Sequence, residues 1–170
     1  WGYFKADVHH NIAIYFSKER NWDQALANYA IVEKLNPNFV MSMYFVGNVF
    51  NDRLNMNKVY NPNWGDADNI PRDAYERALA SYDKVRHLAP NYVQMHHQVG
   101  ALHMKRAEWA MNNGRPAESQ KYLEKAMVRF RLYEAIDPVF QPNYYRMGQI
   151  YMIQKRYPEA AQVYLDLINA

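Results

Sequence analysis

A short stretch near the middle of the chain carries oxygen-bearing side chains that could bind a metal ion. In and just after the segment YNPNWGDADN lie Asp66, Asp68, Asn69 and Asp73. Carboxylate and amide oxygens are calcium ligands, but an EF-hand loop needs Gly at its sixth position and Glu at its twelfth. Counted from Asp66, those positions hold Pro71 and Arg77. The segment does not match that loop, and turn formation and helix capping explain its Asn and Asp residues better.

Two pairs of adjacent histidines are the other candidates for metal binding. They are His9 with His10, and His96 with His97. Neighbouring residues on a helix point in different directions, so neither pair can chelate one ion. His96 and His103 share a helical face, but they are two turns, or about 10 Å, apart along the axis. We therefore expect neither a metal site nor a cofactor.

The sequence also lacks the motifs on which most enzymes depend. It contains no Gly-rich phosphate loop, no nucleophile elbow and no HExxH pattern. Isolated Asp, Glu and His residues on helices usually lie on solvent-exposed faces and have no catalytic role. We therefore predict that the chain is not an enzyme.

Charge and hydropathy exclude two further classes of partner. The 20 basic and 17 acidic residues are spread along the chain without a basic run, so we expect no nucleic-acid binding. No apolar stretch is long enough to cross a bilayer, so we expect no direct membrane insertion by this segment. The absence of Cys fits a reducing or an oxidising compartment, cytoplasmic or periplasmic.

A repeated pattern organises the 170 residues. Four segments each have an Ala followed four residues later by an aromatic residue: Ala25 and Tyr29, Ala78 and Tyr82, Ala126 and Phe130, Ala160 and Tyr164. Three of them continue to a Pro eight residues after the aromatic residue: Pro37, Pro90 and Pro138. Upstream of each Ala lies a small residue with a ring three residues later: Ala13 and Phe16, Gly47 and Phe50, Gly100 and His103, Gly148 and Tyr151.

This spacing predicts pairs of helices. Residues three or four apart share a helical face, small residues let two helices approach, and a Pro just after a helix ends it. The expected helices are 3–19, 22–35, 39–56, 71–88, 92–112, 115–136, 141–154 and 157–169. The pattern resembles the tetratricopeptide repeat (TPR), which returns about every 34 residues. The resemblance implies an all-α superhelix, or solenoid, of four helix pairs in a single domain over residues 1–170.

The repeat units are expected at about 3–37, 38–90, 91–138 and 139–170, and two of them are longer than the others. Ala13 and Ala25 are 12 residues apart, as are Gly148 and Ala160, whereas Gly100 and Ala126 are 26 apart. We expect about two extra turns on each helix of this third pair, which would make an extended hairpin.

The second unit is longer than the first and fourth chiefly because of a long loop, expected at about 57–70. Loops of this length in a compact domain are usually functional or disordered. We predict an ordered loop, with Tyr60 and Trp64 packed near Trp109.

The resemblance also implies a binding surface, since the first helix of each TPR pair lines a concave face that holds extended partner segments. Helical phase and the family pattern place these residues in that groove: His10, Tyr44, Asn48, Asn51, His97, Lys105, Tyr145 and Gln149. Met104 and Met152 lie in the same phase. Of each His pair, we expect one side chain inward and one toward this surface.

The resulting function is a protein–protein interaction scaffold that binds a protein or peptide partner and forms part of a larger protein, since the chain starts at Trp1 rather than Met. One alternative comes from phrases such as NFVMSMYFVGNVFNDR, which look like the tail of bacterial O-antigen ligase or polymerase-type membrane proteins. That likeness implies a soluble appendage of a glycan-assembly enzyme. A second alternative is self-assembly through the C-terminal end, where Leu165 and Ile168 have no polar capping helix.

Overall fold

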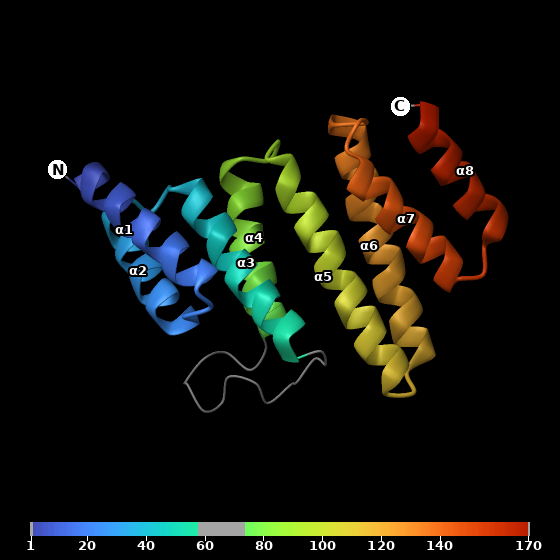
Figure 1. Ribbon diagram of the computed structural model, residues 1–170, viewed down its shortest axis with the longest axis horizontal. Coiled ribbons are helices and arrows are strands. Elements are labelled where there is room, and N and C mark those ends of the chain that lie inside the picture. The colour runs from blue at the N-terminus through green and yellow to red at the C-terminus, as the bar shows by residue number, and fades with distance from the viewer. Residues whose placement is uncertain (1, 58–73, 170) are drawn as a thin grey trace. The chain divides into compact units, whose positions relative to one another are not determined.

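The structure is a computed structural model that describes residues 2–57 and 74–169. These residues form eight α-helices and no β-strand (Figure 1): α1 Gly2–Lys18, α2 Trp22–Leu35, α3 Val40–Asn57, α4 Ala74–Leu88, α5 Val93–Asn112, α6 Pro116–Ile136, α7 Gln141–Ile153 and α8 Tyr157–Asn169. The predicted bounds agree to within one residue wherever both can be compared. The expected start of the fourth helix at residue 71, the loop at 58–70 with Tyr60 and Trp64, and the acidic cluster at 66–73 lie outside the described residues.

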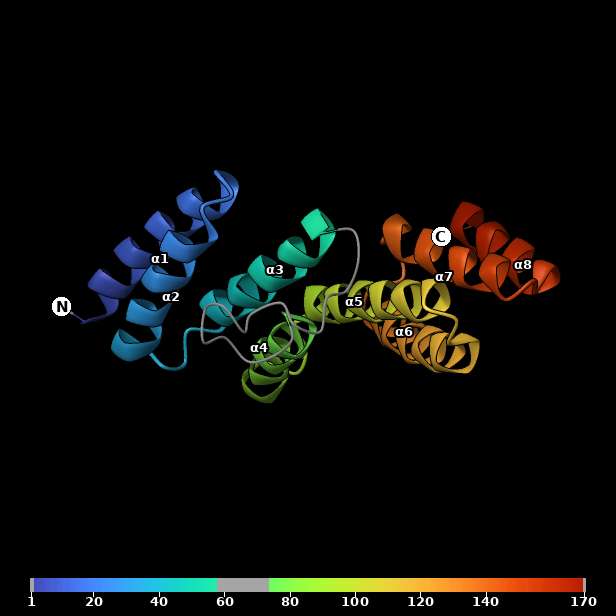
Figure 2. The ribbon, with the colours of Figure 1, turned by 90° about the horizontal axis from the view of Figure 1, so that it is seen from below.

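The helices belong to two compact units, Trp1–Pro90 and Asn91–Ala170. In the first unit, α1 packs on α2 and α3 packs on α4, and contacts of α2 and α1 with α3 join the two hairpins. In the second, α5 packs on α6 and α7 on α8, and α6 contacts α7. Figure 2 shows the paired helices of each hairpin side by side. The division into four repeat units stays a prediction.

The turns inside the hairpins follow from local sequence. Arg20, Gly114 and Lys155 have φ values of 58°, 71° and 59°, in the left-handed region that ends a helix and redirects the chain. Asn21 then caps α2, because its side chain accepts a hydrogen bond from the backbone N–H of Gln24 at 3.4 Å. Helices α5 and α6 contain 20 and 21 residues, against 13 in each of α7 and α8, so the extra residues of this pair lie within both helices.

In three hairpins, a Gly inside the first helix faces an aromatic ring of the second helix. Gly47 faces Tyr82, Gly100 faces Phe130 and Gly148 faces Tyr164. A Cβ atom added at Gly100 would lie 2.5 Å from a ring carbon of Phe130, which is closer than such atoms come in proteins. The small residue and the aromatic residue of the repeat therefore act together, although the sequence separates Gly100 from Phe130 by 30 positions.

We expect Gly100→Ala to lower the free energy of unfolding by about 1–3 kcal/mol, because the ring of Phe130 is fully buried and has no room to move aside. Ala has a higher helix propensity than Gly, which offsets about 1 kcal/mol of the packing loss. Gly148→Ala should cost less, because its neighbour is the hydroxyl end of the half-buried Tyr164, which can swing outward. Urea denaturation of both variants tests this order, and equal losses would contradict it.

Candidate functional site

The predicted groove residues lie on the first helix of each hairpin, and we call this surface the first-helix face. In the first unit it comprises one side of α1 and α3, and in the second one side of α5 and α7. Each unit is described separately. The predicted residues differ strongly in how far they reach the surface.

His10 packs inside the first unit rather than on its surface. Its side chain is 7% exposed, and its ring centroid lies 4.8 Å from that of Phe39, 5.6 Å from Phe45 and 5.9 Å from Tyr29. Burial lowers the pKa of His10 and outweighs the opposing effect of Asp7. The imidazole therefore packs among these rings in its neutral form. This packing corrects the prediction that His10 lines the groove.

His97 occupies the same environment in the second unit. Its ring centroid lies 5.3 Å from Phe140, 5.5 Å from Phe130 and 6.0 Å from Tyr133. Burial lowers the pKa of His97, the nearby Asn143 side chain opposes this effect, and the positive charge of Arg146 adds to the lowering. In both units, a His of the first helix thus meets a Phe just before the first helix of the next pair. This role in joining hairpins was not evident from the sequence.

Two Asn side chains of α3 meet at the hydroxyl group of one Tyr of α4. Tyr82 of α4 donates a hydrogen bond to Oδ1 of Asn48 at 2.8 Å, and Nδ2 of Asn51 donates to the Tyr82 hydroxyl at 3.5 Å. The ring of Tyr44 lies 6.1 Å from that of Tyr82. Burial raises the pKa of Tyr82 above its usual range, so the hydroxyl stays protonated.

This cluster corrects part of the predicted site. Asn51 and Tyr44 are 3% and 8% exposed, so they support the first-helix face from beneath instead of forming it. Asn48 is half-buried. The sequence pattern indicated only that Tyr82 packs between helices. The repeat pairs Tyr82 with Gly47, which precedes Asn48, and this pairing could have indicated the contact with the two Asn residues.

The second unit exposes the remaining predicted residues. Tyr145 and Met152 of α7 are 52% and 49% exposed, and Gln149 between them is also exposed. Lys105 of α5 is half-buried. Residues 145, 149 and 152 follow the helical spacing of four and three, so they form one stripe, which we call the α7 stripe. The structure thus leaves a free surface at α7, while the role of these residues in binding stays a prediction.

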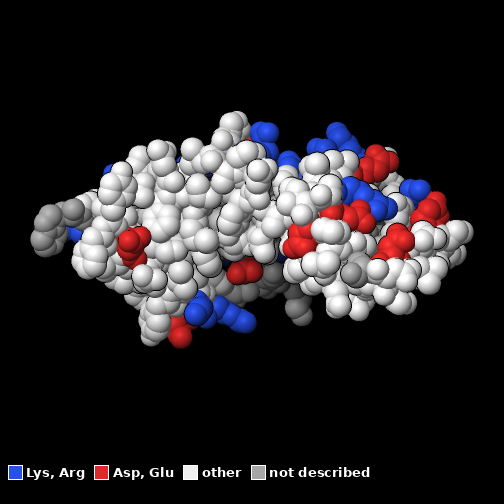
Figure 3. Space-filling model, turned by 90° about the horizontal axis from the view of Figure 1, so that it is seen from above, with Lys and Arg blue, Asp and Glu red and all other residues white. Residues whose placement is uncertain are grey.

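The charges near the α7 stripe are few and mixed. Nη1 of Arg146 donates to Oε1 of Gln149 at 3.3 Å, which holds the amide side chain at one edge of the stripe. On the face of the molecule shown in Figure 3, acidic and basic side chains lie intermixed without a field of one sign, and much of the face carries no charged side chain. Such a surface suits a protein partner better than a polyanion.

No group of three or more His, Asp or Glu residues in the described part of the chain is placed to hold a metal ion. Among residues 2–57 and 74–169, no helix is long and apolar enough to cross a membrane.

Comparisons with known proteins identify the fold. Residues 104–170 match the family model of the tetratricopeptide repeat. A solved structure titled MamA RS-1 ArsTM double mutant has a TM-score of 0.68 at 16% identity, with 96% of this chain and 74% of that chain covered. The protein TTC0263 of Thermus thermophilus, titled a thermophilic TPR protein, has a TM-score of 0.67 at 15% identity, with 96% and 73% covered. A search of curated proteins found no match.

The chain therefore has the all-α tetratricopeptide-repeat fold, and residues 104–170 are assigned to that repeat family. This confirms the fold expected from the Ala, Gly, aromatic and Pro pattern. Neither the family match nor the two structures support a relation to O-antigen ligases. At identities of 15–16%, the likeness defines the fold and not the partner.

Proposed function

We propose that this protein is an interaction scaffold that holds a segment of a partner protein against the first-helix face of the second unit. The fold supports the general role, because tetratricopeptide repeats build extended binding surfaces from stacked helix pairs. The observation that carries the specific proposal is the α7 stripe, which offers Tyr145, Gln149 and Met152 to solvent on one side of a first helix.

The three residue types of the stripe suit a peptide ligand. A Tyr supplies a large rigid contact with a polar tip, and Tyr is enriched among the residues that dominate binding energy. The amide of Gln149 can donate to and accept from a peptide backbone. Met152 adapts to apolar side chains of different shape.

The neighbouring helix α5 extends this surface. Met104 of α5 packs against the core cluster of this unit, which also contains Tyr144 and Met147 of α7. Lys105, next to Met104, adds a cation at the edge. A partner segment that combines an apolar residue with an acidic one fits this arrangement.

The test is co-purification of the partner with the full-length protein from the cells that produce it. We expect the triple variant Tyr145→Ala, Gln149→Ala, Met152→Ala to retain about one tenth or less of the partner, because hot-spot truncations cost about 2 kcal/mol or more. The exposure of these side chains means that the melting temperature should change little.

The matched control removes exposed apolar groups from a second helix of the same unit. Val128 and Leu132 on α6 are 59% and 43% exposed, and their double Ala variant should retain the partner. Loss of the partner in this control but not in the triple variant would overturn the proposal.

A further inference from the structure

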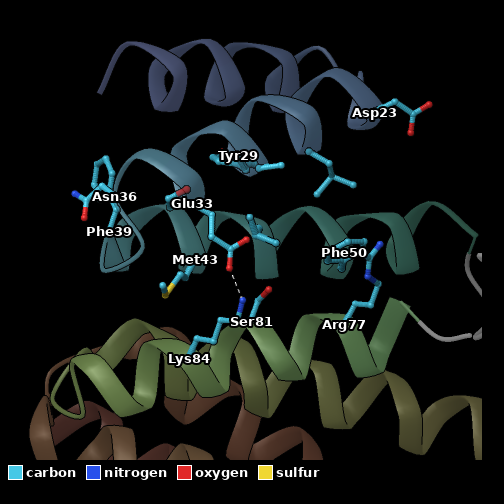
Figure 4. Close-up of a pocket in the computed structure, with 14 residues that line it drawn as sticks. Asp23, Tyr29, Glu33, Asn36, Phe39, Met43, Phe50, Arg77, Ser81 and Lys84 are labelled. Carbon is cyan, nitrogen blue, oxygen red and sulfur yellow. Dashed lines mark hydrogen bonds and ion pairs between the residues drawn. The ribbon is translucent and has the colours of Figure 1, made fainter. Parts of the chain in front are cut away.

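A cavity of about 460 Å³ opens in the first unit between α2, α3 and α4 (Figure 4). Helices α2 and α4 form its two walls and α3 forms its floor. Pockets of this size commonly hold a drug-sized ligand or a few side chains of a peptide. All its lining residues belong to the first unit, so the cavity is complete within that unit.

The cavity lies on a different side of α3 from the predicted groove. Its floor includes Met43, Val46 and Phe50, spaced by three and four residues. At about 100° per residue, these three side chains point about 140–160° away from Asn48, the half-buried groove residue of α3. The cavity is thus a second surface, separate from the first-helix face.

Apolar groups form most of the interior. Leu26 and Ala30 from α2 face the floor residues, and Phe50 is 3% exposed at its base. Ala30 is small and exposed, so it leaves space where a larger residue would fill the cavity. Ser42 and Ser81 add hydroxyl groups to this lining. An apolar side chain entering from solvent would lose its contact with water here and gain packing.

The two ends of the cavity differ in charge. At one end, Nζ of Lys84 on α4 and Oε1 of Glu33 on α2 form an ion pair of 2.6 Å that bridges the walls. At the other end, the guanidinium of Arg77 lies over the ring of Phe50, 4.6 Å from its centroid. Asp23, on the opposite wall, points away from it.

Arg77 is a cation without an ion pair among the described residues. Burial lowers its pKa, and the nearby positive charge of Arg53 lowers it further. Both effects disfavour the charged guanidinium, and the opposite charge of a bound anion would offset them. A carboxylate beside the apolar interior is therefore the complementary charge, and Arg can hold it with two parallel hydrogen bonds.

We propose that the cavity between α2, α3 and α4 binds a short segment of a partner protein, with an aromatic or aliphatic side chain among Leu26, Met43 and Val46 and an Asp or Glu side chain on Arg77. The lining supports a peptide over a polyanion, because Asp23 and Glu33 balance Arg77 and Lys84. The hydroxyl groups of Ser42 and Ser81 offer hydrogen bonds to its backbone.

The experiment selects peptides from a random heptapeptide phage library on the full chain, with depletion on the variant Ala30→Phe, in which the cavity is filled. The peptides that remain should carry Asp or Glu within about two positions of an aromatic residue or Leu, since Arg77 lies at the end of the same cavity that Met43 and Val46 line. A synthetic copy of the most enriched peptide, labelled for fluorescence anisotropy, then serves as the probe for the variants.

Two pairs of variants distinguish peptide binding in the cavity from binding elsewhere on the surface. Ala30→Phe should weaken binding by about tenfold or more, whereas Ala27→Phe, on an exposed position of α2 outside the lining, should leave it within about twofold. Arg77→Gln should weaken it by about tenfold, whereas Arg86→Gln, exposed on α4, should not. Circular dichroism checks the fold, and Ser81→Phe fills the same space if Ala30→Phe does not fold.

Three outcomes would overturn the inference. The library could yield no peptide that survives depletion on Ala30→Phe, the enriched peptides could carry basic in place of acidic residues, or the probe could bind the filled variant as well as the wild type. None of these outcomes affects the proposal for the α7 stripe, since that surface belongs to the other unit.

Discussion

Replacing Phe130 by Ala is expected to lower the free energy of unfolding of the second unit by about 3–5 kcal/mol. The ring is fully buried and belongs to the core cluster with Ala126, Met147 and Ile150. It also fills the space left by Gly100 and contacts the ring of His97 at 5.5 Å. Its loss would therefore leave a cavity at the point where three helices meet.

Urea denaturation followed by circular dichroism measures this loss. The matched control is Val128→Ala, two residues away on α6 and 59% exposed, which should change stability by about 0.5 kcal/mol or less. A similar loss in both variants would show that the ring at position 130 is not the centre of the packing described above.

The second large effect is a fall in stability with acid that depends on His103. Burial lowers the pKa of His103 from 6.5 to about 4, and the positive charges of Arg129 and Lys125 act in the same direction. The unfolded chain therefore binds a proton at this residue as the pH falls through about 6.5, whereas the folded chain binds it only near pH 4. This difference corresponds to a loss of about 3 kcal/mol of folding stability between pH 7 and pH 4.

The readout is the change of unfolding free energy with pH, and not its value at one pH. His103→Gln and His103→Phe should both show a fall between pH 7 and pH 4 that is about 3 kcal/mol smaller than in the wild type. A lower stability of either variant at pH 7 does not affect this comparison. A wild-type slope retained by both variants would contradict the account of His103.

The helix pairs could be predicted because their determinants are local and repeated. Pro37 and Pro138 follow α2 and α6 closely, and the alternation of small and aromatic residues marks which sides of the helices meet. The contact of Gly100 with Phe130 spans 30 positions, but the repeat places both residues in equivalent positions of each hairpin. Periodicity therefore carried information about tertiary packing as well as about helix formation.

The binding surface was harder to predict, because exposure depends on neighbours that the repeat does not specify. Helical phase put His10 and Tyr145 on the same kind of face, yet Phe39 and Phe45 enclose His10, whereas among residues 2–57 and 74–169 Tyr145 has one ring neighbour, Tyr164, at 6.3 Å. These rings come from other helices, and nothing in the local pattern distinguishes the two positions.

The cavity was not predictable from spacing at all. Empty space depends on the combined volume of side chains from three helices, and here a small residue, Ala30, stands opposite Met43 and Val46. The position of Arg77 over Phe50 likewise depends on how α4 packs against α3. Neither feature leaves a periodic signal, so only the assembled unit reveals them.

Photo-cross-linking from the α7 stripe is the most direct measurement of whether this protein is a scaffold that uses its first-helix face. The photoreactive residue p-benzoylphenylalanine is placed at Gln149 in one variant and at Leu132 of α6 in another, both in the full-length protein within its own cells. The account predicts covalent adducts to a defined segment of a partner protein from position 149 and none from position 132. Adducts from position 132 alone, or none from position 149, would contradict it.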